Sequence, residues 1–415
     1  MVIHKNRNTV LKFILFLYLL YFVLSYINGV WFFGGDKYGM NPIYTSNVNN
    51  IRLVYLIAVL ALGIYEMVLH IRKLAIVDQL LMIVFFVLTL VKLFEVSQIV
   101  DTQTLLFQSG TPMMYLVFLF FFVGMDDKVE EDLLKLSKIY ALIYLSLTIL
   151  WFLDFCADIG YSVGVRFQSS PILYSFNNGL FFLIYALYNE KNHRTPFWKV
   201  LLSLVVVATF ITTSRGWLLQ TVIIFMMYFL LRNRGKRVIL NIIKTALVIF
   251  GLVIIIRIAA PDVVNGILSR MGQSTRSSQL EAFFAQVPLT VLITGLGYNA
   301  SYSFSMWEHY QFIDNQIIFS AFRYGIVIIG IMTYFLIKPF FISLTLSPED
   351  RLRSFGVVHF VLAMLGLSIY FALAIDSSFL VAYALAGRMY MNARNIQLEM
   401  ESSEDDEEID VEMIE

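Results

Sequence analysis

The sequence predicts an all-α integral membrane protein with about 12 transmembrane helices and one large extracytoplasmic loop between spans 9 and 10. Three observations lead to this fold class. The 415 residues are 59% hydrophobic and only 14% charged, whereas a soluble domain carries about 25% charged residues. The apolar residues form blocks long enough to cross a bilayer core of about 30 Å, which takes roughly 20 helical residues. Lys and Arg gather in alternate loops, as in membrane bundles.

The predicted spans follow the apolar blocks in chain order. Inside lipid only a helix satisfies its own backbone hydrogen bonds, so each block is expected to be helical. Blocks seven and eight are separated only by a short corner at Thr212–Arg215. The spans are predicted at 10–30, 51–70, 74–94, 111–125, 139–156, 171–188, 198–213, 216–231, 238–258, 315–337, 354–375 and 377–392.

Orientation follows from the basic residues, which concentrate in cytoplasmic loops of membrane proteins. If both termini are cytoplasmic, 21 of the 30 Lys and Arg residues fall on the cytoplasmic side. The sequence therefore predicts a polytopic membrane domain over residues 1–398, with both termini inside. Its large extracytoplasmic loop is expected at 258–314, where Gln279–Val287 is predicted to form a short amphipathic helix before Pro288.

The net charge of zero hides an uneven distribution. Residues 399–415 contain ten Asp or Glu and no Lys or Arg. So dense a run of like charge predicts a disordered acidic cytoplasmic tail. Without it the chain has 30 basic and 20 acidic residues, a net charge of +10. Neutrality therefore does not exclude an anionic ligand.

Several classes of site are not expected. The run Gly295–Ala300 (GLGYNA) matches a loose dinucleotide-binding pattern after the strand-like Val291–Thr294, but that fingerprint needs a βαβ unit, so a tight turn is the better interpretation. The five histidines show no metal-ligand spacing, and the single Cys156 can form no intramolecular disulfide. We expect no metal, no cofactor and no nucleic acid.

Arginines on the predicted outer side are the main functional signal, because charges within or beside membrane spans are costly. Arginine offers a fixed fork of donors that matches phosphate. Several arginines at the outer leaflet indicate an anionic partner such as a lipid phosphate or diphosphate. Snorkelling or local pairing is the alternative interpretation for each of them. They are Arg166, Arg215, Arg257, Arg270, Arg276 and Arg323.

Asp314 lies where the long loop re-enters the membrane. It is a candidate general base or a group that orients a sugar hydroxyl, and it is equally suited to cap the following helix. His309, the only histidine predicted outside, is a candidate to share the proton transfer. An aromatic stretch that begins at Tyr298 offers ring faces for sugars, although aromatic belts also collect at membrane interfaces.

Three local motifs resemble those of the Wzy-type polysaccharide polymerases and the related O-antigen ligases. The run Thr213–Leu219 (TSRGWLL) is similar to the family's corner motif around an arginine. Arg276–Glu281 (RSSQLE), followed by the GLG turn, is similar to its long-loop segment. Asp314 and Asn315, with ten residues between Asp314 and Gly325, resemble its D/H-N…G motif. The ligases usually have His at the first position, so Asp314 favours a polymerase.

The resemblance implies a membrane glycosyltransferase that needs no metal. A growing glycan would leave undecaprenyl diphosphate and join a lipid-linked repeat unit at the outer face of a bacterial cytoplasmic membrane. The implied catalytic residues are Asp314, Arg215 and His309, and the implied substrate-binding residues are Arg166, Arg276, Arg270, Asn315 and Tyr298. The implied partners are the undecaprenyl-diphosphate-linked oligosaccharide, membrane lipids and a protein that regulates chain length.

Two alternatives stay open at this point. One is an O-antigen ligase-type transferase, which differs in its acceptor. The other, from a different class, is a flippase or transporter of lipid-linked oligosaccharides, because twelve spans suit it equally well. Transporters usually show internal repeats and broken helices at the midplane of the membrane. Here the charges cluster on the outer side, which favours chemistry at the surface.

Overall fold

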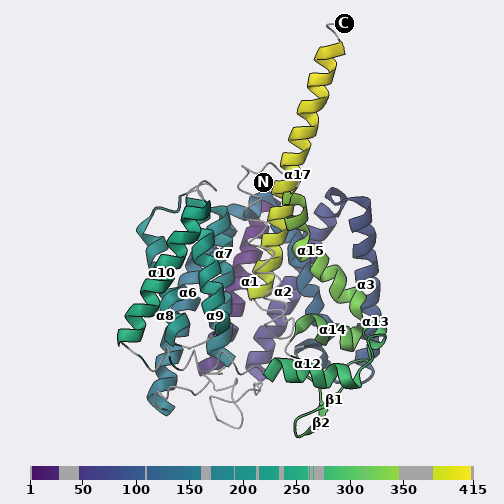
Figure 1. Cartoon of the computed structure of the whole chain (residues 1–415). Coiled ribbons are helices and arrows are strands. Elements are labelled where there is room, and N and C mark those ends of the chain that lie inside the picture. The colour runs from purple at the N-terminus through teal and green to yellow at the C-terminus, as the bar shows by residue number, and fades with distance from the viewer. Residues whose placement is uncertain are drawn as a thin grey trace.

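The computed structural model is a bundle of helices with a small cap at one end (Figure 1). It describes residues 2–27, 46–107, 110–159, 170–190, 192–211, 215–232, 238–259, 261, 265, 275–313, 315–344 and 377–412. Both termini lie at the end of the bundle opposite the cap (Figure 1). We call the two ends the cap end and the terminal end.

The first part of the chain is almost entirely helical. Two 3₁₀ segments, η1 and η2, interrupt the α-helices, and η2 runs directly into α5. The elements are α1 (Val2–Ile27), α2 (Ser46–His70), η1 (Ile71–Lys73), α3 (Ile76–Ser97), α4 (Thr102–Phe107), η2 (Pro112–Leu119), α5 (Phe120–Gly124), α6 (Asp127–Ile159), α7 (Ser170–Asn189), α8 (Pro196–Ile211), α9 (Arg215–Arg232) and α10 (Val238–Ala259).

The second part contributes the cap and the last helices of the bundle. The cap consists of α12 (Thr275–Gln286), α13 (Val291–Thr294), the strands β1 (Tyr302–Phe304) and β2 (Trp307–Tyr310), and α14 (Gln316–Tyr324). The bundle then continues with α15 (Ile326–Leu344) and α17 (Ser377–Glu412). The short helix predicted at Gln279–Val287 is confirmed up to Gln286, as the second part of α12.

Length and apolar character identify an α-helical membrane protein. Within the described residues, five stretches are long and apolar enough to cross a membrane: Arg7–Ile27, Asn50–Lys73, Ile76–Ser97, Glu131–Asp154 and Ile326–Leu344. On α3, large side chains such as Leu90 (63% exposed) and Phe94 (69% exposed) point away from the protein. So much exposed apolar surface needs lipid around it. The count of about 12 spans stays a prediction, because residues 354–375 lie outside the described ranges.

The tenth predicted span, 315–337, is not one continuous helix. It is divided between α14 and α15 at Gly325, whose φ of +91° is a conformation that favours glycine. A Cβ at Gly325 would lie 2.5 Å from the backbone oxygen of Ile293, so α13 packs directly against this break. The spanning helix therefore begins at Ile326, and α14 belongs to the cap.

The cap has a small apolar core of its own. Phe283 of α12 meets Tyr302 of β1 and Phe322 of α14, with ring centroids 5.2 and 5.0 Å apart. The strands pair antiparallel as a two-stranded hairpin. Val291–Thr294, which the sequence indicated as strand-like, is instead the single helical turn α13, because so short an apolar run fits either structure.

The acidic segment at the end of the chain is helical as far as Glu412, since α17 continues through it. Figure 1 shows this part of α17 extending beyond the bundle at the terminal end. This differs from the predicted disorder of residues 399–415. Extending an existing helix costs much less than nucleating a new one, and the packed half of α17 supplies the nucleus.

Helices α5 and α17 approach each other closely through two glycines. A Cβ at Gly124 would collide with the backbone oxygen of Ala384, and a Cβ at Gly387 with that of Phe121. Small residues that allow such close approach are typical of helix packing in membranes.

We expect Gly124→Ala to lower the melting temperature of the purified protein, because overpacking of this kind costs about 1–3 kcal/mol. Gly330→Ala on α15 is the matched control, since a Cβ there would have nothing within 4 Å. Thermal unfolding followed by size-exclusion chromatography in detergent measures both. Equal melting temperatures for the two variants would contradict the close packing of α5 against α17.

Candidate functional site

The structure describes the predicted site only in part. Asp314, Arg166 and Arg270 lie outside the described residues. Arg215 is the first residue of α9 and Arg276 the second residue of α12, and their side chains also lie outside the description.

Asn315 is the N-cap of α14. Its Oδ1 accepts a hydrogen bond from the backbone N–H of Ile318 at 3.1 Å, in the geometry of a helix cap. The sequence had offered Asp314 for this role, and the structure assigns it to the next residue.

His309 and Tyr298 lie in different environments. His309 lies on β2 with its side chain exposed, beside Trp307, which is 62% exposed. Tyr298 is buried, with 7% of its surface exposed. The structure therefore brings Tyr298, and not His309, into the interior of the cap end.

Tyr298 packs on Arg323, a residue of α14 that is only 3% exposed. The guanidinium carbon of Arg323 lies 4.9 Å from the centroid of the Tyr298 ring and 4.5 Å from that of Phe319. Burial raises the pKa of the Tyr298 phenol, although the charge of Arg323 lowers it. The ring thus stays neutral and offers its π face to the cation.

The GLG turn fixes Tyr298 against Arg323. Gly295 and Gly297 have φ angles of +78° and +92°, which confirms a tight turn rather than a dinucleotide-binding motif. The backbone N–H groups of Leu296 and Gly297 donate to the carbonyl oxygens of Phe322 and Arg323, both at 2.8 Å. A Cβ at Gly295 would lie 2.5 Å from the Arg323 oxygen. The turn is therefore glycine-rich because it lies against the end of α14.

The polar contacts of Arg323 are sparse for a buried cation. Its Nη1 donates to the carbonyl oxygen of Gly110 at 3.4 Å, and its buried Nε has no hydrogen-bond partner. No carboxylate of the described residues forms an ion pair with it. Burying a charge costs several kcal/mol, whereas a desolvated cation–π contact contributes about 2 kcal/mol. This part of the cap end therefore keeps a positive potential that the described protein groups do not neutralise.

Comparisons with protein-family models, with curated proteins and with solved structures give no match for this chain.

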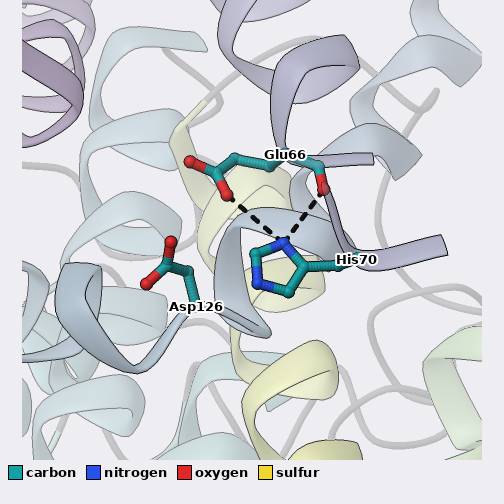
Figure 2. Close-up of side chains that lie close together, drawn as sticks. All are labelled: Glu66, His70 and Asp126. Carbon is teal, nitrogen blue, oxygen red and sulfur yellow. Dashed lines mark hydrogen bonds and ion pairs between the residues drawn. The ribbon is translucent and has the colours of Figure 1, made fainter. Parts of the chain in front are cut away.

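A second buried polar cluster lies near the start of α1, at the terminal end. Figure 2 shows Glu66 and His70 of α2 facing Asp126, which precedes α6. Their potential ligand atoms lie within 4.8 Å of one another, and all three side chains are buried. The Nδ1 of His70 lies 3.0 Å from the Glu66 carbonyl oxygen and 3.4 Å from its carboxylate. Such a group of side chains is able to hold a metal ion.

Arg7 of α1 already supplies a positive charge to this cluster. Its Nη1 donates to both carboxylate oxygens of Glu66, at 3.0 and 3.2 Å, and also to Asp126. A guanidinium thus bridges the two carboxylates that a metal ion would need. We therefore interpret the cluster as an ionic clamp that joins α1, α2 and the start of α6.

We expect Arg7→Ala to destabilise the protein strongly, because it leaves two buried carboxylates without their partner, a change that costs about 3–5 kcal/mol. Lys12→Ala is the matched control: the Lys12–Asp132 pair, at 3.0 Å, has a Lys side chain that is 50% exposed, and such a pair contributes only about 0–1 kcal/mol. Thermal unfolding in detergent measures both variants. Adding Glu66→Gln to Arg7→Ala should recover part of the loss. Equal losses in Arg7→Ala and Lys12→Ala would contradict the clamp.

The sequence indicated Arg323 as a charge inside a predicted span and Tyr298 as a site residue, but not their contact with each other or with Gly110. Gly110, whose carbonyl oxygen accepts from both Arg323 and Tyr324, is more than 200 positions away. No local pattern reveals such a contact. In the clamp, Glu66 and His70 are four residues apart, so the sequence places them on one face of a helix. No such local spacing connects Arg7 or Asp126 to them.

Proposed function

We propose that this protein is a polysaccharide polymerase of the bacterial cytoplasmic membrane. It transfers a growing glycan from undecaprenyl diphosphate to a lipid-linked repeat unit at the outer face, with both of its termini in the cytoplasm. The cap end is then the outer end. The proposal builds on the resemblance of the three sequence motifs.

The observation that carries the proposal is the position of the cap. Residues 275–313 and α14 fold over the end of the bundle opposite both termini (Figure 1). Within this cap the GLG turn of one resembling motif is joined by two backbone hydrogen bonds to the end of α14, the helix that follows Asn315 of another. It presents exposed aromatic residues, Trp307 and Phe312, on the same end. Such an arrangement supports chemistry on a lipid-linked glycan at one membrane surface.

The break between α14 and α15 also favours an enzyme over a transporter. Transporters place broken helices near the middle of the bilayer. The break at Gly325 instead comes immediately before the spanning stretch Ile326–Leu344, at the cap end. It therefore lies at a membrane surface, where a lipid-linked acceptor would present its sugar.

The proposed reaction exchanges one glycosidic bond for another. The acceptor hydroxyl attacks the anomeric carbon of the donor glycan, and the bond from that carbon to the diphosphate oxygen breaks. Asp314 accepts the hydroxyl proton or orients the hydroxyl, and His309 is the candidate second proton carrier. Arg215 stabilises the departing diphosphate. Arg166, Arg270 and Arg276 are the proposed further contacts to the diphosphate, while Tyr298 and Asn315 shape the cap beside it.

A deletion strain tests the proposal with a single gel of surface glycan. Loss of a polymerase should leave single repeat units attached to the cell surface, and the intact gene should restore long chains. Loss of all repeat units would instead indicate a ligase. Purified protein that moved lipid-linked repeats across vesicles without joining them would indicate a flippase.

A further inference from the structure

We propose that Arg323 is the centre of a binding site for a phosphate-type oxyanion at the cap end of the membrane domain. The inference rests on the buried side chains around Arg323 and holds whether or not the protein polymerises glycans. The ligand chemistry is a phosphate or diphosphate group, supplied either by a lipid head group or by a soluble molecule.

The charge of Arg323 is not balanced by an acidic partner among the described residues. The side chain is only 3% exposed, and its polar contacts are a long hydrogen bond from Nη1 to the Gly110 carbonyl oxygen and a contact with the Tyr324 hydroxyl. Its buried Nε has no hydrogen-bond partner. Asp101 is near enough to Tyr298 to affect its phenol electrostatically. Its Oδ1, however, accepts a hydrogen bond from the backbone N–H of Thr104 at 2.7 Å and so caps α4. An anion would supply both the missing charge and the missing acceptor.

Protein groups hold the guanidinium of Arg323 in place before any ligand arrives. Its central carbon lies over the rings of Tyr298 and Phe319, and the GLG turn fixes both Tyr298 and the end of α14. Tyr324, the next residue, donates its hydroxyl to the same Gly110 carbonyl oxygen at 2.8 Å. A guanidinium that is held in this way offers its fork of N–H donors to an oxyanion with little further loss of freedom.

An unpartnered acceptor lies on the same face of α14 as Arg323. Gln316 is 2% exposed, and its Nε2 donates to the Ser320 hydroxyl at 2.7 Å, but its buried Oε1 has no partner. Gln316, Ser320 and Arg323 are spaced as one helix face. A ligand that carries a hydroxyl near its anionic oxygens, such as a phosphorylated sugar or a protonated phosphate, would satisfy Oε1 and Arg323 together.

Arg323 also lies at a depth in the membrane that suits a lipid phosphate. Arg323 lies three residues before the spanning stretch Ile326–Leu344. A stretch of that length covers about 28 Å of helix, nearly the thickness of the hydrocarbon core. Arg323 is thus placed at the boundary of the hydrocarbon, the level at which the phosphate groups of lipids lie.

Binding to the purified full-length chain tests the proposal. The protein is kept in a maltoside detergent, which contains no phosphate, and is titrated with inorganic diphosphate, with farnesyl diphosphate and with farnesol as the uncharged match. The measurement is the rise in melting temperature with ligand concentration, which yields an apparent affinity. We expect a rise with at least one of the diphosphates and none with farnesol.

Variants locate the site. Arg323→Gln should weaken the apparent affinity by about tenfold or more, since hydrogen bonds to charged groups are strong. Arg323→Lys keeps the charge without the fork and should give an intermediate affinity, so the test stands even if the Gln variant does not fold. Arg194→Gln is the matched control, because Arg194 is an exposed arginine between α7 and α8 that is not among the candidate anion-binding arginines.

The outcomes are separable. A rise with both diphosphates indicates a soluble or head-group oxyanion, and a rise with farnesyl diphosphate alone indicates a lipid head group. No rise in the wild-type protein, or the same affinity in the wild type and in both Arg323 variants, would overturn the proposal. Because no glycan is present, failure here leaves the polymerase proposal untouched, and failure of the polymerase assay leaves this one untouched.

Discussion

Replacing Asp314 by Asn is expected to abolish long-chain glycan while the protein still reaches the membrane. The substitution keeps the shape of the side chain but removes the carboxylate that accepts a proton, a role that contributes about 10²–10⁴-fold to the rate. The capping hydrogen bond of α14 is made by Asn315, so Asp314→Asn leaves this bond in place. The loss of activity should therefore occur without a matching loss of stability.

Asn315→Ala supplies the control for Asp314→Asn. It removes the cap of α14, at a cost of about 1 kcal/mol, and leaves the carboxylate of Asp314 in place. We expect a lower melting temperature than in Asp314→Asn and a smaller loss of long chains, because Asn315 is a proposed substrate contact and not a proton acceptor. A gel of surface glycan and a melting curve for each variant make the comparison. Wild-type chain lengths in Asp314→Asn would refute a role for Asp314 in the reaction.

Arg215→Gln is the second prediction with a large effect, a loss of long-chain glycan that we expect to reach about 10²–10³-fold in rate. Arg215 is the first residue of α9. The N-terminus of a helix carries partial positive charge, so a cation there is unfavourable by about 0.3–1 kcal/mol at exposed sites. The variant should therefore be as stable as the wild type or slightly more stable. A residue that costs stability and supports activity is best explained by binding of an anion.

Arg257→Gln serves as the control for Arg215→Gln, because Arg257 lies in the last turn of α10, where the helix dipole favours a cation. We expect it to lose a little stability and no activity. Arg215→Gln should thus lower the activity without lowering the melting temperature. Arg257→Gln should lower the melting temperature slightly without lowering the activity. Equal chain lengths in both variants would contradict the role given to Arg215.

The positions of the helices were predictable because apolar blocks of about 20 residues have few alternatives in lipid. The division at Gly325 was not, because a glycine inside an apolar run carries no local sign of a positive φ. That angle is set by α13, whose Ile293 oxygen leaves no room for a side chain at this position. The helical turn at Val291–Thr294 was missed for a similar reason, since its tertiary contacts decide its conformation and not its β-branched residues.

The class of ligand was predictable from the sequence, but the set of residues that contact one another in the candidate site was not. Outer-side arginines indicated an anionic ligand, and Tyr298 was selected as an aromatic residue near them. Its contact with Arg323 depends on the GLG turn docking on α14, and the Gly110 carbonyl comes from a distant segment. The Glu66–Arg7–Asp126 clamp joins three elements through long-range pairs. Such contacts depend on the packing of helices, which residue spacing alone does not encode.

The helix α17 has a consequence for how the protein meets its surroundings. Its 36 residues correspond to about 54 Å of helix, nearly twice the thickness of the hydrocarbon core. Its distal half bears nine carboxylates between Glu399 and Glu412, and an anionic lipid surface would repel them over about one Debye length, roughly 8 Å at physiological salt. The first half of the helix therefore packs in the bundle, and the acidic second half is expected to stay off an anionic membrane surface and to be open to basic partners.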